Sequence, residues 1–301
     1  MCDDVTEAHN EALIKSGVLT RRTFSAAGLA TTLAACVSTP TDPKAVVERD
    51  VDITTPDGVC DSYFVAPASG KHAAIIVWPD IGGLRPAFRE MGKALAQSGY
   101  AVLTVNPFYR SARGVQYDAT KETIQQAMGR TRAFAGVLNA SPDNPAKDAT
   151  AFVAWLDKQK EVDTGKGIGT TGYCMGGPLV MRTMAAQPNR VKAGCTFHGG
   201  GLAVTGGTNE LAKANSPHLL VPKMKAKAVL IAVAQNDDTT DPTVKETVKQ
   251  AFASASIPAE VEVYPANHGW CVPDNGAVFN KAEADRAWGR MLATWQKAGM
   301  A

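Results

Sequence analysis

The feature that most constrains the fold is a cysteine set among small residues, between a predicted strand and a predicted helix. The segment from Gly172 to Gly177 reads GYCMGG, with a β-like stretch at 168–171 before it and a helix-like stretch at 178–186 after it. A sharp turn strains its central residue, here Cys174, and only glycine-sized neighbours let strand and helix approach closely. The positive end of the new helix also favours a thiolate. The segment therefore predicts a reactive cysteine at a tight turn.

The other elements predict an α/β fold with a doubly wound, mainly parallel sheet and an N-terminal antiparallel hairpin. Two strand-like segments, 46–53 and 60–66, flank a turn sequence with proline and glycine. Strand-like and helix-like segments then alternate, which is typical of a parallel sheet covered by helices. We expect strands at 73–78, 101–105, 167–171, 193–197, 228–234 and 260–264, and further helices at 87–97, 120–138, 146–159, 242–255 and 277–298. Residues 140–145 and 199–222 are expected to be surface loops.

The first 36 residues are typical of a bacterial export signal. Arg21 and Arg22 precede an uncharged, alanine-rich stretch that is too short to span a bilayer but suits the hydrophobic part of a twin-arginine signal. Residues 33–36 also match a lipobox, which makes Cys36 a candidate for lipid anchoring. We therefore expect an export signal at 1–36, a linker at 37–45 and one catalytic domain at 46–301. The partner would be the twin-arginine machinery, and the location periplasmic or otherwise extracytoplasmic. The alternative is a buried helix with two chance arginines.

Charge and cysteine spacing limit the other functions. The chain has 301 residues and a net charge of +2, with no basic cluster, so we expect no nucleic-acid partner. Cys60, Cys174, Cys195 and Cys271 follow the leader, and a Cys60–Cys195 or a Cys195–Cys271 disulfide stays open. None of these cysteines has the spacing of metal ligands, so no zinc or other metal site is expected.

A nucleophilic cysteine needs a base, and the base needs an orienting acid. In the α/β-hydrolase fold the order along the chain is nucleophile, acid, histidine. His268 follows the last strand, and Asp237 lies three residues after the strand at 228–234, so we predict the triad Cys174, Asp237 and His268. Asp238 is the alternative acid, or it caps the next helix. There is also a non-catalytic interpretation of two of these residues, in which Cys174 is an inert buried residue and His268 an ordinary loop residue.

Other residues are expected around the triad. The N–H groups of Met175 and Ile81 are predicted to form an oxyanion hole, because one follows the nucleophile and the other lies in a glycine-containing loop after a strand. Asp80 would face the site or cap the following helix. His198 ends a strand ahead of any acid, so we assign it, with Trp270, to the substrate pocket. His218 is a weaker candidate for the same role.

These residues together resemble the dienelactone hydrolase family of α/β-hydrolases over about residues 46–298. The resemblance implies cleavage of enol-lactones or related esters through a cysteine acyl-enzyme, without a cofactor. It also implies that Arg110 grips a substrate carboxylate. Two departures concern the substrate. Asp80 stands where the family has a glutamate, and no arginine follows His268 closely. Together with these two differences, the resemblance predicts that the substrate is a neutral or singly charged small-molecule ester or lactone.

Three other functions remain open on sequence alone. The protein could be a general thioesterase or carboxylesterase on the same fold, or a non-catalytic envelope binding protein, since fold alone does not guarantee chemistry. A thiol-redox protein is the third, and the absence of any C-x-x-C motif disfavours it.

Overall fold

The structure, a computed structural model, describes residues 45–301 and is built on an eight-stranded sheet. The strand order is β1-β2-β4-β3-β5-β6-β7-β8; β1 pairs antiparallel with β2 and β2 with β4, and every other pairing is parallel. The strands are β1 (Val46–Thr55), β2 (Gly58–Pro67), β3 (Ala74–Trp78), β4 (Ala101–Val105), β5 (Ile168–Tyr173), β6 (Val191–Phe197), β7 (Ala228–Ala234) and β8 (Ala259–Tyr264). The predicted fold class is confirmed.

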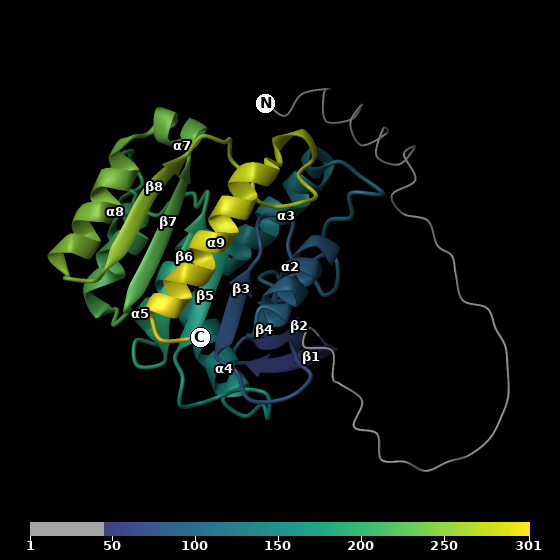
Figure 1. Ribbon diagram of the computed structural model, residues 1–301. Helices are drawn as coiled ribbons and strands as arrows, with labels where there is room; N and C mark the ends of the chain where they lie inside the picture. The colour runs from purple at the N-terminus through teal and green to yellow at the C-terminus, as the bar shows by residue number, and fades with distance from the viewer. Residues whose placement is uncertain (1–44) are drawn as a thin grey trace, which may run out of the picture.

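Helices cover both faces of the sheet (Figure 1). They are α2 (Pro86–Gln97), α3 (Ile124–Leu138), α4 (Asn144–Leu156), α5 (Gly176–Ala186), α6 (Glu210–Ala214), α7 (Gln235–Thr240), α8 (Thr243–Ser254) and α9 (Lys281–Lys297), with 3-10 turns η1 (Pro217–Lys223) and η2 (Gly276–Val278). Side chains alternate along a strand, so the neighbours Ile75 and Ile76 in β3 belong to different apolar clusters. One cluster includes α4, α5 and α8, and the other α2 and α9.

Local sequence explains several element ends. The hairpin turns at Thr55, whose hydroxyl donates to the carbonyl of Gly58 at 3.0 Å, and Gly58 adopts a φ of 141°. The helix expected from residue 120 begins later, because Thr123 forms a capping box with Gln126. Asn280 likewise starts α9 by accepting the N–H of Glu283 at 3.2 Å.

Residues 199–222 differ from the expected loop. They contain the short helix α6 and the 3-10 turn η1, and Asn209 caps α6 by accepting the N–H of Ala212 at 2.9 Å. The acid loop after β7 also forms a short helix, α7, which the sequence did not predict. Helix α7 contains few strong helix formers, so contacts made by the folded chain decide its conformation, whereas α6 consists of good helix formers but is only five residues long.

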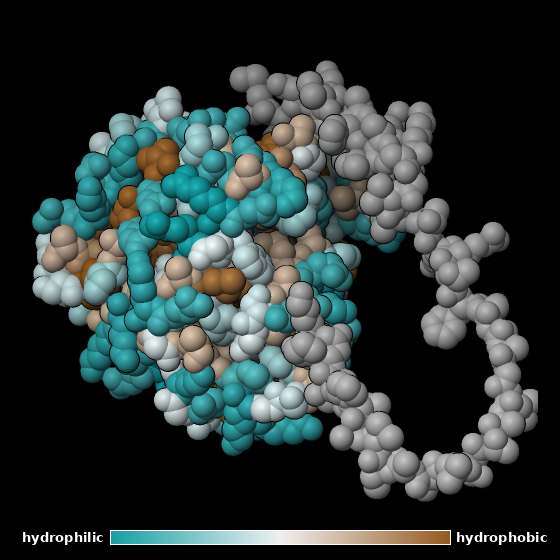
Figure 2. Space-filling view, in the orientation of Figure 1, coloured by the Kyte–Doolittle hydropathy of each residue, from teal (hydrophilic) through white to brown (hydrophobic). Residues whose placement is uncertain are grey.

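The molecular surface is mostly hydrophilic on the face shown in Figure 2, where hydrophobic residues form small, separate spots. Across the part of the chain that the structure describes, none of the helices reaches the length and hydrophobicity that a bilayer crossing requires. The predicted export signal, including Arg21, Arg22 and Cys36, lies outside the described residues, as does nearly all of the predicted linker.

Candidate active site

Cys174 lies at the turn between β5 and α5, with a φ of 52°. Two glycines make this strained conformation possible. A Cβ on Gly172 would stand 2.2 Å from the carbonyl oxygen of Gly176, and a Cβ on Gly176 would stand 2.4 Å from that of Trp78. Strand, helix and the end of β3 are therefore packed backbone against backbone around the cysteine.

Hydrogen bonds from the end of β6 hold the turn. The N–H of Cys174 is shared between the carbonyl of Phe197 and Nδ1 of His198, each 3.1 Å away. The carbonyl of Cys174 accepts the N–H groups of Gly177 at 3.0 Å and Gly200 at 3.3 Å. The first turn of α5 follows Cys174 directly, which places the positive end of the helix dipole beside the thiol.

His268 and Asp237 meet as the sequence order suggests. Nδ1 of His268 lies 2.7 Å from Oδ2 of Asp237, at the carboxyl ends of β8 and β7. The side chain of Asn236 fixes the same loop by accepting the N–H of His268 at 2.8 Å. Burial alone would lower the pKa of His268, but its hydrogen bond to Asp237, the nearby Cys174 and the charge of both groups raise this pKa to about 10. The ring is therefore predominantly an imidazolium at neutral pH.

Asp238, the alternative acid, points elsewhere. Its Oδ2 pairs with the ammonium of Lys245 at 2.7 Å. Asp238 does not cap the next helix either, because the side chain of Asp241 accepts the N–H of Thr243 at 3.1 Å.

The two predicted oxyanion donors lie on segments that touch. Gly176, next to Met175, packs against the carbonyls of Trp78 and Pro79, which bring the loop carrying Ile81 to the cysteine turn. Within residues 45–301, no protein group accepts the N–H of Ile81 or of Met175. The assignment of these two groups to an oxyanion hole stays a prediction.

His198 and Trp270 form a buried wall beside His268. The centroid of the His198 ring lies 4.7 Å from that of His268 and 5.2 Å from that of Trp270, and both His198 and Trp270 are at most 1% exposed. Burial and the neighbouring charge of His268 hold the pKa of His198 well below its ordinary value. His198 is therefore a neutral ring. His218 hydrogen-bonds through Nδ1 to the hydroxyl of Ser216 at 2.7 Å.

Asp80 is held by an arginine that the sequence analysis did not single out. Its carboxylate forms two hydrogen bonds with Arg85, at 2.6 and 3.0 Å, and accepts the N–H of Gly82 at 2.8 Å. Asp80 does not cap α2, whose N-cap residue is Arg85 itself. No sequence signal marks Arg85, because its second partner, Asp274, lies 189 residues along the chain.

Arg110 is likewise committed to carboxylates of the protein. Its guanidinium pairs with Asp57 at 2.7 Å and with Asp148 at 2.7 Å, and the side chain of Asp148 is 1% exposed. These pairs tie the segment after β4 to the hairpin turn and to α4. A role of Arg110 in gripping a substrate carboxylate stays a prediction.

The cysteines do not form the disulfides considered above. Cys60, Cys195 and Cys271 are free and buried, and Cys174 is free and partly exposed. Cys60 belongs to one apolar cluster, whereas Cys195 and Cys271 belong to the cluster on the other face of the sheet. The sheet therefore separates Cys60 from Cys195. Burial raises the pKa of the three buried thiols, which keeps them protonated.

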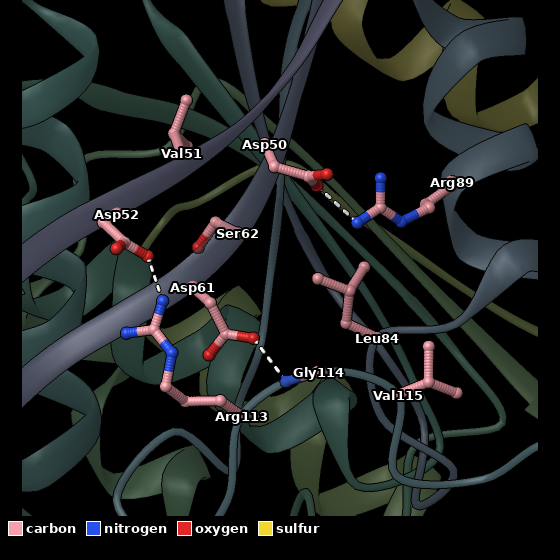
Figure 3. A pocket seen from close by; sticks show the side chains of 10 residues that line it. All are labelled: Asp50, Val51, Asp52, Asp61, Ser62, Leu84, Arg89, Arg113, Gly114 and Val115. Carbon is pink, nitrogen blue, oxygen red and sulfur yellow. Dashed lines mark hydrogen bonds and ion pairs between the residues drawn. The ribbon is translucent and has the colours of Figure 1, made fainter.

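An open pocket of about 550 Å³ lies at the hairpin rather than at the triad. Its walls come from β1, β2, α2, the loop before α2 and the segment 113–115, as Figure 3 shows. Arg89 pairs there with Asp50, and Arg113 with Asp52. Both arginines are thus already neutralised, and none of the triad residues lines this pocket.

Comparisons with known proteins identify the family of the chain. The dienelactone hydrolase family model matches residues 60–299. A Methylorubrum extorquens protein provisionally named a carboxymethylenebutenolidase is 26% identical, over 98% of this chain and 99% of its own. The carboxymethylenebutenolidase of a Pseudomonas species is 28% identical over 41% of this chain and 49% of its own. A Klebsiella pneumoniae crystal structure provisionally identified as a dienelactone hydrolase has a TM-score of 0.68 at 23% identity, covering 84% of this chain and 99% of that one. The chain belongs to the dienelactone hydrolase family.

Proposed function

We propose that this member of a hydrolase family cleaves an enol-lactone or another activated ester of a small molecule through an acyl-enzyme on Cys174. The observation that carries the proposal is the position of His268, which hydrogen-bonds to Asp237 at 2.7 Å and lies near enough to Cys174 for that residue to raise its pKa. A base that joins an acid to a thiol at a tight turn is the arrangement that nucleophilic catalysis requires.

In the first half-reaction the thiolate of Cys174 attacks the acyl carbon and forms a C–S bond. The carbonyl oxygen becomes an oxyanion, which the N–H groups of Met175 and Ile81 stabilise. The C–O bond to the enol then breaks as the carbonyl re-forms. The enolate leaves with the electron pair of that bond and takes a proton from the His268 imidazolium, or from water. Because a thiolate is a poor group for expelling an ordinary alkoxide, we expect simple alkyl esters to react slowly.

The second half-reaction depends on a change in His268. Acylation removes the negative charge of Cys174, which is one of the groups that raise the pKa of His268. The pKa of His268 therefore falls in the acyl-enzyme, and the neutral ring can take a proton from water. The hydroxide so formed attacks the thioester, the C–S bond breaks, and the acid leaves while Cys174 regains its charge.

The charges around the site favour an uncharged substrate. The name carboxymethylenebutenolidase refers to a lactone that bears a carboxylate, and such a group calls for a free cationic partner. In this chain Arg85 and Arg110 each already pair with two carboxylates. We therefore include in the proposal that the substrate is a neutral ester or lactone.

Hydrolysis of a panel by the purified protein tests the proposal. The panel contains neutral enol-lactones, a carboxylate-bearing enol-lactone, aryl esters, alkyl esters and thioesters, each also tested with Cys174→Ala. We expect neutral enol-lactones and aryl esters to be cleaved fastest, with no turnover by the variant. Preference for thioesters would indicate a general thioesterase instead. No turnover, together with a Cys174 that iodoacetamide fails to alkylate at neutral pH, would favour the non-catalytic binding protein.

We further propose that the enzyme works outside the cytoplasm, on the basis of the sequence of residues 1–36 alone. Replacement of Arg21 and Arg22 by lysine should retain the protein in the cytoplasm, and Cys36→Ser should release it from membranes. An unchanged distribution after both changes, measured by cell fractionation, would exclude the export signal and the anchor.

A further inference from the structure

Arg85 connects the two loops that carry the proposed oxyanion donor and the proposed base. Its Nη1 and Nη2 donate to Asp80 at 2.6 and 3.0 Å, and its Nε and Nη2 donate to Asp274 at 2.7 and 2.8 Å. One guanidinium thus makes two bidentate pairs. The residue is 1% exposed, and the central carbon of its guanidinium lies 4.9 Å from the centroid of the Phe88 ring and 5.6 Å from that of Tyr117.

The first pair orders the oxyanion loop. Asp80 lies directly before Ile81, and its carboxylate also accepts the N–H of Gly82 at 2.8 Å while its carbonyl accepts that of Gly83 at 2.9 Å. Arg85 adds a bond to the carbonyl of Gly83 at 3.3 Å. The whole turn that presents the Ile81 N–H is therefore folded around the Asp80–Arg85 pair.

The second pair reaches the histidine loop. Asp274 follows His268 by six residues, and the next residue, Asn275, donates to the carbonyl of Gly269 at 3.0 Å. The position of the loop that carries His268 is thus coupled to that of Arg85. Only a planar guanidinium can bind both carboxylates in this way, because it has two edges that each carry a pair of N–H donors, and an ammonium group has none.

We propose that Arg85 is a positioning residue, which sets the oxyanion donor of Ile81 and the base His268 in register across two loops far apart in the sequence. This inference rests on the proposed function. The alternative is that Arg85 contributes only to the stability of the fold, like any other buried ion pair.

Two reactions of Cys174 separate these roles. Hydrolysis of an aryl ester needs both the thiolate and the oxyanion hole, whereas alkylation by iodoacetamide needs the thiolate and forms no oxyanion. We expect Asp80→Asn to lower kcat for the aryl ester about tenfold or more, with KM within about threefold and alkylation within about twofold. Asp274→Asn should lower both hydrolysis and alkylation, because it releases the histidine loop.

The double variant Asp80→Asn/Asp274→Asn and the single variant Arg85→Lys test the coupling. If Arg85 joins the loops, the losses in kcat do not multiply, and Arg85→Lys reproduces the loss of the double variant. The matched control is Arg190→Lys, which breaks a bidentate pair that Arg190 makes with Asp157 at 2.7 and 3.2 Å. Arg190 lies directly before β6, so this pair is at the amino ends of the strands, away from the proposed active site. We expect this control to lose stability but to keep kcat and alkylation.

Three results would overturn the proposal: losses that multiply in the double variant, equal losses of hydrolysis and alkylation in Asp80→Asn, or no change in either reaction in Asp274→Asn. Asp274 has a side chain that is 25% exposed, so Asp274→Asn should fold even if Asp80→Asn does not. The hydrolysis and alkylation rates of Asp274→Asn, taken with its melting temperature, are then sufficient to decide whether Arg85 positions the two loops or only stabilises the fold. A failure of the proposed function shows separately, because the unmodified protein would then hydrolyse no ester.

Discussion

The backbone N–H of Cys174 donates a hydrogen bond to Nδ1 of His198, with 3.1 Å between the two nitrogens. Since Nδ1 accepts, the ring carries its proton on Nε2, an atom that is buried and has no partner within residues 45–301. His198 also adopts a φ of 41°, which is unusual for a residue with a side chain. A neutral, strained and fully buried histidine thus supports the cysteine turn.

The effect of substituting His198 on kcat should therefore depend on whether the new side chain can still accept the hydrogen bond from the Cys174 N–H. Asparagine tolerates a positive φ and offers an oxygen in place of Nδ1, so we expect His198→Asn to keep kcat within about tenfold. His198→Phe fills the space but leaves the Cys174 N–H with the Phe197 carbonyl alone, and we expect a loss well beyond tenfold. Steady-state kinetics on an aryl ester compare the two. Equal losses in both variants would show that the acceptor is irrelevant.

The proposed nucleophile is tested by comparing two cysteines. We expect Cys174→Ala to lower kcat for an enol ester at least about 1000-fold, because no other group replaces the thiolate. Cys60→Ser is the control, since Cys60 is buried in the core beside Ser62 and Asn106. Mass spectrometry of the quenched enzyme should find the acyl adduct on residue 174 in the unmodified protein. Full activity of Cys174→Ala would assign the nucleophile elsewhere.

Asp237 should control how readily Cys174 ionises. The Asp237 carboxylate helps to raise the pKa of His268, so Asp237→Asn should leave more neutral imidazole at pH 7 and fewer ion pairs between His268 and Cys174. We expect alkylation by iodoacetamide to slow about tenfold for each unit by which the pKa falls. The difference should shrink above about pH 9, where a thiol ionises unaided. Asp238→Asn is the control, and a pH profile of Asp237→Asn that matches it would contradict the assignment of the acid.

The His268 proton also makes stability depend on pH. The folded-state pKa of about 10 exceeds the ordinary value of 6.5, so the folded protein binds this proton more tightly than the unfolded chain. The resulting contribution to the free energy of unfolding is complete below pH 6.5 and is lost as the pH rises through 10. We expect the difference in Tm between the unmodified protein and His268→Gln to be largest near pH 6 and to narrow to almost none above pH 10. A constant difference would contradict the shifted pKa.

Gly176 should not accept even a methyl group. The added Cβ in Gly176→Ala would meet the carbonyl oxygens of Trp78 at 2.4 Å and Pro79 at 2.9 Å, and neither backbone atom can move without shifting the oxyanion loop. We expect a loss of about 1–3 kcal/mol in stability and of at least about tenfold in kcat. A Cβ on Gly200 has no neighbour within 4 Å, so Gly200→Ala is the control. Similar behaviour of the two variants in thermal melts and kinetics would show that the crowding is relieved.

Much of the fold could be predicted because apolar periodicity reports burial. The central strands β3, β4 and β5 are buried throughout, and their sequences are correspondingly apolar or small. Helix α7 could not be predicted, since its residues Gln235–Thr240 favour helix only weakly, and α6, although rich in helix formers, is only five residues long, too short for a periodic apolar pattern. The order of nucleophile, acid and base likewise indicated that Asp237 and His268 would meet.

Interactions between distant residues set the limit of the sequence analysis. Arg85 shows this most clearly, because an arginine before a helix carries no mark of its contact with Asp274. The same holds for Arg110, where the resemblance to a family implied a substrate contact while the folded chain supplies Asp57 and Asp148 as partners. The ion-pair partners of a buried arginine depend on which loops come together in the folded protein. The spacing of residues along the chain does not show which loops these are.

The backbone-to-backbone packing around Cys174 has a consequence for how such an enzyme diversifies. Gly172 and Gly176 leave no room for side chains next to Cys174, so substitutions at these two positions cannot change which substrates the protein accepts. Residues 199–222 lie beside the same cysteine, through the Gly200 hydrogen bond, and expose Leu211 and Leu219 to 72% and 50%. Relatives that acquire new substrates are expected to change this segment, while the chemistry at the turn is inherited intact.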